Sequence, residues 1–444
     1  MKAKMTWLTV RHAVLISPVD VEFRKSSAFP TTEQRLLFTA NQLFPVTSLN
    51  HLQMYRRSSV SLFSLSVFLL YYSGATTSFT VPDSPIKSLW KISDKKIIPV
   101  LDEYRNIEIG PEARNLSGQE LIDYVNSRQT LWKAGNTKFN SYDATVKYGL
   151  LGVSDLKKSI KEKKKLPVMQ YSNSYIPESF DAREKWPECE SLRNIRDQSS
   201  CGSCWAVAAV EAMSDRICIM SKGKVQVTLS AEDLLSCCRT CGFGCYGGIP
   251  VAAWKYWISS GIVTGSSYTN HTGCRPYPFP PCEHHSNKTH YKPCKHDLYP
   301  TPKCVRKCDK NYKKSYRSDK YYGKKAYGVD SDVEAIQREI MTMGPVEASF
   351  EVYSDFLQYT GGIYKHLAGS VGGGHAVKLI GWGIDQGVPF WLAANSWNTD
   401  WGEDGYFRII RGIDECGIES GIVAGIPKRR GKSKFHEFNE FSIE

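Results

Sequence analysis

The distribution of cysteines is the feature that most limits how this chain can fold. All 14 cysteines of the 444 residues lie between Cys189 and Cys416, and the first 188 residues contain none. Such a density is typical of domains that disulfides hold together in an oxidising compartment. We therefore expect a cysteine-free N-terminal part and a disulfide-stapled globular part, in a chain long enough for two or three domains.

The composition is that of an ordinary soluble globular protein, with 41% hydrophobic and 23% charged residues. The net charge of +12 has two interpretations, a surface for nucleic acid or anionic polysaccharide, or scattered surface lysines. We favour scattered lysines, because the dense cluster at residues 157–165 lies in a segment that we expect to be removed. By default such a run is a solvated, protease-sensitive linker. We expect no nucleic-acid partner.

A targeting signal is predicted within the first 75 residues. Residues 1–53 show no sustained periodicity and remain unassigned. Met54 is followed by two arginines, by a mostly apolar run over residues 60–72, and by Ser-Gly-Ala at 73–75. This order is typical of a cleaved signal peptide, and the run is short for a membrane span. We expect residues 54–75 to be a signal peptide that starts at Met54, with 1–53 not translated; the alternative is a signal anchor with a cytoplasmic tail.

Residues 76–175 are expected to form a separate segment. They are polar and contain no cysteine, and two short apolar stretches interrupt them at 132–135 and 150–152. The residues that start at Ser117 have the spacing of an amphipathic helix. Ser117 and Glu120 have the Ser-x-x-Glu pattern of a capping box.

From residue 176 onward the pattern predicts an α+β fold. Apolar residues recur at helical spacing after Cys204, and residues 230–235 are predicted to form a second short helix. Runs rich in β-branched and aromatic residues predict strands; they are residues 376–382, 390–394 and 405–410. Between the helical and the strand-rich halves lies a proline- and histidine-rich loop, residues 274–308. Two such halves can pack with a cleft between them.

Cys204 has two interpretations. It follows Ser203, which we expect to cap a buried helix, so its thiol would lie in the first helical turn. The positive end of the helix would lower the pKa of this thiol and make it a nucleophile. In a chain with 14 cysteines, a disulfide cysteine ahead of a core helix is the alternative.

A thiol nucleophile needs a base, and the base needs a group that orients it. His375 follows three glycines at the start of a predicted strand; taken alone, it could equally be a structural histidine at a glycine-rich edge. Asn395 could hold the imidazole by a hydrogen bond that Trp397 covers from water. Gln198 could donate to an oxyanion beside the backbone N–H of Cys204.

These motifs resemble those of papain-like cysteine proteases. The resemblance rests on Cys-Gly-Ser-Cys-Trp at 201–205, Gly-Gly-Gly-His-Ala at 372–376 and Asn-Ser-Trp at 395–397. Within that family the chain resembles cathepsin B, especially the parasitic-worm digestive type. Residues 274–308 fall where cathepsin B carries its occluding loop.

The resemblance implies a papain-like two-domain fold of the α+β class. A helical left half and a β-barrel-like right half would enclose the active-site cleft between them. Residues 76–175 would be an inhibitory propeptide, 176–427 the protease domain with its occluding loop, and 428–444 a C-terminal tail. The implied activity is that of a cathepsin B-like endopeptidase with peptidyl-dipeptidase capacity. It would be made as a zymogen, active at acid pH, and lysosomal or secreted.

The resemblance also assigns roles to single residues. Cys204 would be the nucleophile, His375 the general acid and base, Asn395 the orienting group and Gln198 the oxyanion donor. The implied substrate-binding residues are Gly247, Gly248, Gly374, Trp397, Gly421, His284 and His285.

The family's cysteine pairing implies six disulfides. They are Cys189–Cys218, Cys201–Cys245, Cys237–Cys304, Cys238–Cys241, Cys274–Cys308 and Cys282–Cys294. This pairing leaves Cys204 and Cys416 without a disulfide partner. Cys204 would then be free to react, and Cys416 is expected to be a buried structural thiol.

The loop at 274–308 combines cysteines and histidines, and such spacing by itself invites a zinc site. The resemblance favours another role, so we expect no metal. His285 would bind the C-terminal carboxylate of a substrate, which gives dipeptide removal, and His284 would clasp the loop to Asp197. Both tasks would depend on pH at about pH 5–6, where imidazole titrates.

Two positions depart from the family pattern. The loop lacks the arginine that normally pairs with Asp400, and only His290 or Lys292 could replace it. We therefore expect the loop to open easily and to favour endopeptidase activity. Gly421 stands where cathepsin B usually has a glutamate at the base of the S2 pocket, so we expect a preference for apolar P2 residues.

The expected partners are protein and peptide substrates, the chain's own propeptide as inhibitor, and cystatin-type inhibitors. No cofactor and no stable membrane span are expected. Glycosylation candidates are Asn115, Asn270 and Asn287. The main alternative function is an inactive binding scaffold on the same fold, against which the intact set of catalytic residues argues.

Overall fold

The computed structural model describes residues 101–283 and 290–429, which belong to one compact unit of the chain. The predicted signal peptide at 54–75, the first part of the segment 76–175 and most of the tail 428–444 fall outside these residues and stay predictions. So do His284, His285 and Asn287. Among the described residues, no helix is both long and apolar enough to cross a membrane.

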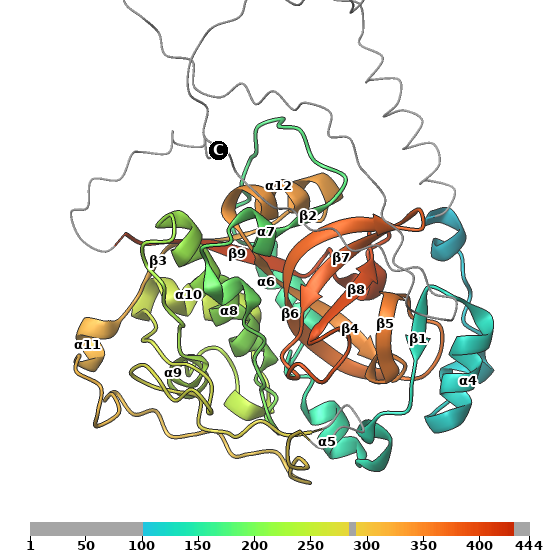
Figure 1. The fold of residues 1–444 in the computed structure, drawn as a ribbon, viewed down its shortest axis with the longest axis horizontal. Helices are drawn as coiled ribbons and strands as arrows, with labels where there is room; N and C mark the ends of the chain where they lie inside the picture. Colours follow the sequence, from blue (N-terminus) through green and yellow to red (C-terminus); the bar gives the residue numbers. More distant parts are fainter. Residues whose placement is uncertain (1–100, 284–289, 430–444) are drawn as a thin grey trace, which may run out of the picture. The chain divides into compact units, whose positions relative to one another are not determined.

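Three helices form the centre of the first half of the globular part (Figure 1). They are α8 (Cys204–Met220), α9 (Ala231–Cys237) and α10 (Pro250–Ser260). The long helix α8 is buried over nearly its whole length and packs against Trp254 and Trp257 of α10. The Ser230 hydroxyl caps α9 by accepting the Asp233 N–H. The two helices predicted from the sequence in this half are confirmed.

Two helix caps lie at the predicted residues, but neither side chain makes the expected capping hydrogen bond. Ser203 stands at the N-cap of α8, but its hydroxyl bonds the buried Tyr277 hydroxyl over 2.8 Å instead of a helix N–H. Ser117 stands at the N-cap of α4 (Gly118–Arg128) and likewise makes no capping hydrogen bond. Local sequence gives the position of a helix start, whereas tertiary neighbours decide where a hydroxyl points.

The second half is built on a mixed sheet with the order β1-β5-β8-β7-β6-β4-β9-β3, and β2 pairs with β6. The strands are β1 (Trp132–Ala134), β2 (Phe180–Asp181), β3 (Gly323–Gly328), β4 (Val346–Tyr353), β5 (Tyr359–Tyr364), β6 (Val371–Asp385), β7 (Val388–Ala394), β8 (Tyr406–Ile410) and β9 (Ile422–Pro427). Only β5 and β8 pair in parallel. Over the described residues the sheet stays open, so the expected barrel-like half is not a closed barrel, while the α+β class is confirmed (Figure 1).

Buried ion pairs join the helices to the sheet. Lys378 of β6 binds Asp215 of α8 over 2.8 Å, and Arg216 of α8 binds Glu339 of α12 (Val333–Met343) over 2.5 Å. All four side chains are fully buried. Removing one member of such a pair costs roughly 3–5 kcal/mol, because the other charge is left uncompensated. The first pair therefore fixes α8, which begins at Cys204, against β6, which carries His375, and the second fixes α8 to α12.

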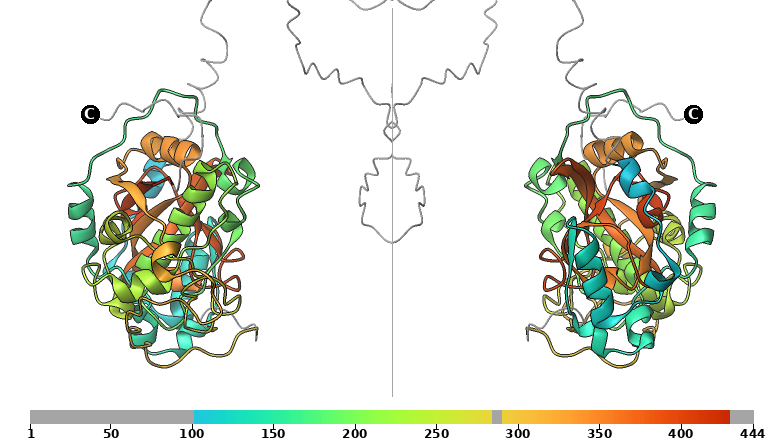
Figure 2. Two further views of the ribbon diagram at one scale, coloured as in Figure 1. Left: turned by 90° about the vertical axis from the view of Figure 1, so that its left-hand side faces the viewer. Right: turned by 90° about the vertical axis from the view of Figure 1, so that its right-hand side faces the viewer.

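Residues 101–163 pack on the edge of the sheet beside β5 and then turn toward the helices (Figures 1 and 2). Their helices are α3 (Pro111–Arg114), α4, η1 (Lys138–Ser141), α5 (Ala144–Gly149) and α6 (Leu156–Lys163). Strand β1 pairs with β5, so this segment extends the sheet. The smaller elements elsewhere are α7 (Ala182–Lys185), η2 (Glu190–Arg193), η3 (Gly244–Tyr246), α11 (Tyr316–Asp319), η4 (Phe356–Gln358) and η5 (Glu415–Gly417).

The run at 157–165, expected to be a solvated linker, is mostly helical in α6, and Ser159 and Lys163 are buried while most of its lysines are exposed. The Asp155 side chain caps α6 by accepting the Lys158 N–H, and the helix places Lys163 at only 7% exposure. The Lys163 ammonium donates to the Ser420 carbonyl over 2.9 Å. The run is lysine-rich, but one face of it packs against the globular part that begins at residue 176.

Candidate active site

Cys204 lies at the first residue of α8, and its side chain is fully buried. Its Sγ accepts the backbone N–H of Gly152, a residue of the N-terminal segment, over 3.2 Å. Burial is the main reason why the pKa of this thiol is raised to about 12. The expected lowering by the helix end is therefore wrong for this state, because desolvation outweighs the helix dipole.

His375 on β6 is also fully buried, and its Nε2 lies 2.8 Å from Asn395 Oδ1. The same Oδ1 accepts the backbone N–H of Ser396 over 2.8 Å, which identifies it as the amide oxygen. His375 Nε2 must then be the protonated nitrogen, so Nδ1 carries the lone pair. Among the described residues Nδ1 has no hydrogen-bond partner. It is therefore available as a base.

The surroundings keep this imidazole neutral. Burial lowers the pKa of His375 to about 4, against the opposing effect of the Asn395 hydrogen bond. The Trp397 ring lies 4.9 Å from the imidazole ring, as expected for a side chain that covers the hydrogen bond. Ala376, the next residue along β6, packs in one apolar cluster with Cys204. Nucleophile and base thus lie at the junction of α8 and β6, both uncharged, and among the described residues no hydrogen bond joins Cys204 Sγ to His375 Nδ1.

Both the oxygen and the nitrogen of the Gln198 side-chain amide make hydrogen bonds. Its Oε1 accepts the Ser396 hydroxyl over 2.7 Å, so Nε2 must point the other way. Nε2 donates to the Cys201 carbonyl over 2.8 Å and to the carbonyl of Leu150, in the N-terminal segment, over 2.9 Å. The donor assigned to the oxyanion is therefore already occupied by a carbonyl of the chain itself.

The N-terminal segment crosses the nucleophile between two backbone walls. The Val153 N–H donates to Gly374 O over 2.9 Å, and the Ser154 N–H donates to Gly248 O over 3.0 Å. The Gly248 N–H donates in turn to Gly152 O over 2.8 Å. A Cβ at Gly152 would overlap the Gly202 carbonyl, so only glycine fits at this point. The segment thereby excludes any other peptide from Cys204.

The sequence of the chain matches that of a known protein family. Residues 176–426, more than half of the chain, match the family described as papain family cysteine protease. The chain belongs to this family. Its free cysteine, its histidine–asparagine pair and its covered cleft have the arrangement of a cysteine protease in zymogen form.

Relatives narrow the family to cathepsin B-like proteases. The chain is 64% identical over 334 residues to cathepsin B-like cysteine proteinase 6 of Caenorhabditis elegans, covering 74% of this chain and 88% of the relative. It is 52% identical over 313 residues to the cathepsin B-like cysteine proteinase of Schistosoma japonicum, covering 70% and 90%. Among solved structures, proCathepsin B S9 from Trypanosoma congolense matches with a TM-score of 0.61 and 38% identity, covering 70% and 98%. This protein is a cathepsin B-like cysteine peptidase.

The glycines of the peptidase walls are required by close packing. A Cβ at Gly248 would overlap the Trp205 ring, and Gly247 has a positive φ of 107°. Gly374 lies directly against Val153 of the segment. A Cβ at Gly421 would overlap the Ser349 carbonyl, so this buried position has no room for a side chain as the strands stand.

Tyr142 of the N-terminal segment is a contact that the sequence did not reveal. Its hydroxyl donates to Glu283 O and accepts the Cys294 N–H, each over 3.1 Å. It packs in one apolar cluster with the Cys282–Cys294 disulfide. A single tyrosine among the segment's many polar residues carries no pattern that marks this role. The segment therefore bonds to the loop at 274–308 as well as to the nucleophile.

Asp197, which is expected from the sequence to hold the loop, is partly buried and accepts three hydrogen bonds. It accepts the Ser199 N–H over 2.6 Å, the Cys282 N–H over 3.1 Å and the Asn398 amide over 2.9 Å. Burial raises its pKa to about 6 despite these hydrogen bonds. The expected clasp by His284 lies outside the described residues and stays a prediction.

The loop also approaches Asp400, through His290. His290 Nδ1 lies 3.6 Å from Asp400 Oδ2. His290 is one of the two residues that the sequence offered in place of the missing arginine. The pair is half open to solvent, since the His290 side chain is 62% exposed and that of Asp400 only 8%.

The cysteines pair as the family resemblance implies. The disulfides are Cys189–Cys218, Cys201–Cys245, Cys237–Cys304, Cys238–Cys241, Cys274–Cys308 and Cys282–Cys294. Cys204 and Cys416 form no disulfide. Across residues 101–283 and 290–429, no group of acidic, histidine and cysteine side chains could hold a metal ion.

Proposed function

We propose that this cathepsin B-like peptidase is a zymogen whose mature form is an acid-active endopeptidase that also removes C-terminal dipeptides. The observation that carries the proposal is the path of residues 150–154. They bond to Gln198, Cys204, Gly248 and Gly374, the residues expected to bind a substrate. Residues 76–175 are then the propeptide, and 176–427 the protease domain. The destination is a lysosome or the extracellular space.

The mechanism follows from the groups that the segment covers. After its removal, His375 Nδ1 takes the proton of the Cys204 thiol, and Sγ attacks the scissile carbonyl. The Gln198 Nε2–H and the Cys204 N–H stabilise the oxyanion. The imidazolium then protonates the leaving amine, and the neutral ring activates water to release the acyl group. Asn395 holds the Nε2–H throughout, so Nδ1 always faces the reaction.

Removal of the segment is also expected to change Cys204 and His375 from a neutral pair to a charged pair. Desolvation is what raises the thiol pKa and lowers the imidazole pKa in the covered state. Water in the open cleft removes that penalty, so a thiolate and an imidazolium can stabilise each other. A neutral resting pair and a charged active pair are the expected zymogen and enzyme.

Dipeptidase activity would depend on the loop that ends the cleft. Asp197 and Asp400 bind its two ends, at Cys282 and His290. His285 would take the substrate carboxylate and His284 would complete the clasp to Asp197. Because the His290 side of the His290–Asp400 pair is exposed, the loop is expected to open readily and admit longer substrates.

The specificity proposed for the S2 pocket is apolar. Gly421 supplies no carboxylate, and Leu156 of α6 packs near Ala376 and Cys204 in the covered cleft. A partly buried apolar side chain thus already packs beside the nucleophile. We expect the mature enzyme to cleave Z-Phe-Arg reporters at least ~10-fold faster than Z-Arg-Arg, since a pocket without a counter-ion disfavours a buried guanidinium.

The proposed function is tested by comparing the chain from Thr76 with the form processed to Ile176. The processed form should hydrolyse Z-Phe-Arg at acid pH and take up one E-64 per chain at Cys204, whereas the longer form should be latent. Release of dipeptides from a peptide C-terminus is followed in parallel. A processed chain that takes up no E-64 at acid pH would show that the protein is an inactive scaffold.

A further inference from the structure

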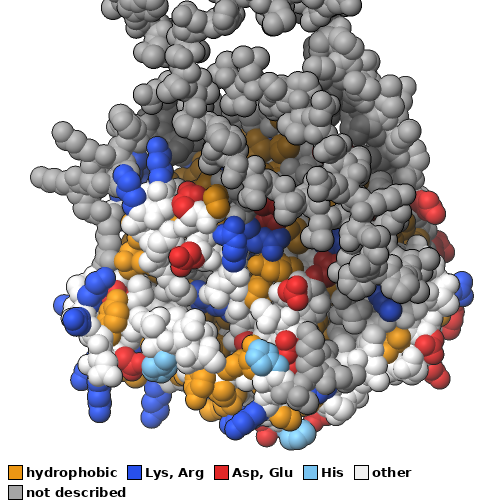
Figure 3. All heavy atoms as spheres, viewed as in Figure 1, with side chains coloured by type: hydrophobic (Ala, Val, Ile, Leu, Met, Phe, Trp, Pro, Cys, Tyr) orange, Lys and Arg blue, Asp and Glu red, His pale blue; other side chains and the backbone are white. Residues whose placement is uncertain are grey.

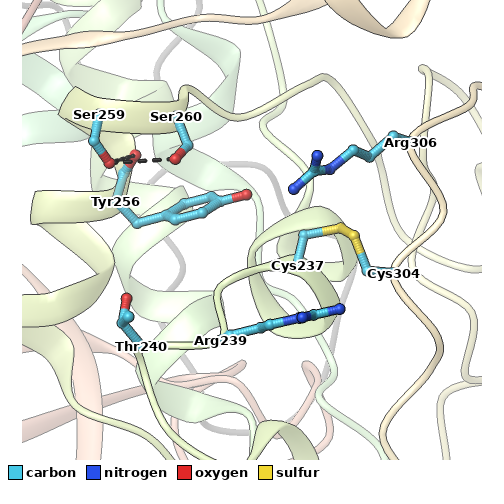
Figure 4. Close-up of a pocket in the computed structure, with 8 residues that line it drawn as sticks. All are labelled: Cys237, Arg239, Thr240, Tyr256, Ser259, Ser260, Cys304 and Arg306. Carbon is cyan, nitrogen blue, oxygen red and sulfur yellow. Dashed lines mark hydrogen bonds between the residues drawn. A yellow bond between two sulfur atoms is a disulfide. The ribbon is translucent and has the colours of Figure 1, made fainter.

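A second concavity lies among residues that have no role in the catalysis described above. It has a volume of about 700 Å³. Its walls come from the end of α9 with the residues after it, from the end of α10, and from residues 304–306 near the end of the 274–308 loop (Figure 4). The Cys237–Cys304 disulfide ties the first wall to the third across 67 residues of sequence. Two of the three walls are therefore covalently linked.

Two guanidinium groups face this pocket without an acidic partner. Arg239 and Arg306 lie on either side of the disulfide in Figure 4, and both are exposed. No ion pair joins either arginine to an acidic side chain within residues 101–283 and 290–429. The nearby carboxylate of Asp233 is already bound by Lys320 over 2.8 Å and by the Tyr316 hydroxyl. The pocket thus has two positive charges that no described residue neutralises.

Hydroxyl groups complete the lining. Thr240, Ser259 and Ser260 each contribute one, and the Ser259 and Ser260 hydroxyls lie 3.2 Å apart. Burial raises the pKa of Tyr256 to about 12, so its phenol keeps its proton and remains a donor. Figure 4 shows the Arg306 side chain directed toward this phenol. Guanidinium groups beside hydroxyl donors suit a ligand that carries both an anionic group and hydroxyls.

The surface that continues from the pocket is basic. Residues 301–325 contain ten lysines and arginines and only two acidic residues. Lys and Arg side chains gather around the position of α11, which lies in this stretch (Figures 1 and 3). Such a field raises the local concentration of anions and speeds their capture. It acts over the surface, whereas the paired arginines and hydroxyls are confined to the pocket.

We propose that the pocket between α9, α10 and residues 304–306 binds a sugar-sized molecule that bears a sulfate or phosphate ester. The two arginines bind the ester, and the hydroxyl-bearing walls contact the sugar. A bare inorganic ion would leave most of the 700 Å³ empty. The ester can come from a free sugar ester or from a unit of a polysaccharide, because both present the same group to the pocket.

Calorimetric titration of the full chain carrying Cys204→Ala tests the proposal without self-processing. The probes are glucose 6-phosphate, glucose 6-sulfate, glucose, inorganic phosphate and dextran sulfate. We expect the sugar esters to bind and glucose not to bind. Arg239→Gln and Arg306→Gln should each weaken binding about tenfold, as the loss of one charge-assisted contact does. Arg306→Lys, which keeps the charge, should fall between wild type and Arg306→Gln.

Lys307→Gln is the matched control, because Lys307 is exposed on the same basic stretch and does not line the pocket. It should change the affinity less than about twofold, as expected for a screened surface charge. Binding of dextran sulfate alone, lost in both arginine variants, would assign a polysaccharide source. The proposal is overturned if no probe binds, if glucose or inorganic phosphate binds as tightly as the esters, or if Lys307→Gln weakens binding as much as Arg306→Gln. Unchanged melting temperatures show that each variant is folded.

Discussion

The Gly152 N–H donates to Cys204 Sγ over 3.2 Å, so the residue that silences the nucleophile comes from 52 positions earlier in the same chain. This hydrogen bond is made by the backbone, yet it requires a specific residue type. Any side chain at Gly152 would overlap the Gly202 carbonyl. The block of the nucleophile therefore depends on glycine at position 152.

Gly152→Ala should make the zymogen leaky. The added methyl group must push the segment away from Gly202, and overpacking of this kind costs about 1–3 kcal/mol. We expect E-64 to label the unprocessed variant roughly ten times faster than the wild-type zymogen. Gly361→Ala is the control, because a Cβ there makes only ordinary contacts with Glu403. Equal labelling of wild type and Gly152→Ala would contradict the proposed block.

Tyr142→Phe should loosen the occluding loop in the zymogen alone. Its hydroxyl bonds Glu283 O and Cys294 N, and leaving such buried groups unpaired costs about 1–3 kcal/mol. We expect faster hydrogen exchange around Cys282–Cys294 in the unprocessed variant. The processed enzyme, which lacks residue 142, should match wild type in rate and specificity. Tyr124→Phe, at a segment tyrosine that packs on the core away from the loop, serves as the control.

Acid should destabilise the docked segment through His375. Its pKa is about 4 in the covered site against an ordinary 6.5, so the covered state excludes a proton that the open state binds. Docking is then unaffected above pH 6.5 and weakens as the pH falls toward 4, by roughly 3 kcal/mol at most. Hydrogen exchange of residues 150–154, measured across this range on the Cys204→Ala chain, should show the loss. In a chain that also carries His375→Gln, the dependence should largely disappear; a persisting slope would assign it to another group.

The two contacts that hold the occluding loop, one at Asp197 and one at Asp400, should differ in strength. A half-exposed pair such as His290–Asp400 contributes less than about 1 kcal/mol, so His290→Ala should lower the ratio of dipeptidase to endopeptidase activity by less than about fivefold. Asp197→Ala removes a partly buried carboxylate that accepts the Cys282 N–H and two further hydrogen bonds, and it should lower that ratio further. Both rates are measured on the processed enzyme. Lys292→Gln should leave them unchanged, and a larger effect there than at His290 would reassign the contact to the lysine.

Much of the local structure could be predicted from residue order. Helical spacing of apolar residues placed the helix after Cys204, and a run of β-branched and aromatic residues placed the strand that follows His375. The resemblance to a known family supplied the disulfide pairs, which spacing alone leaves open among many connectivities. The candidate bases and donors were likewise visible as residue types near glycines and aromatic residues.

The pattern failed where a distant part of the chain decides the environment. A lysine-rich run predicts solvent, but the peptidase surface buries one face of α6. The thiol at a helix start predicts a low pKa, but the segment that covers it removes the water on which that depends. Tyr142 gave no signal, since its partners lie more than 140 positions away.

The sequence by itself determined most of the elements and the reactive residues, because these depend on local spacing and on residue chemistry. Only the tertiary structure decided their state. Gly152 reaches Cys204, Leu150 reaches Gln198, and Arg239 and Arg306 line one pocket, although these positions are distant in the sequence. Desolvation and charge pairing act through space over a few ångströms, so protonation, latency and the second pocket are properties of the folded chain.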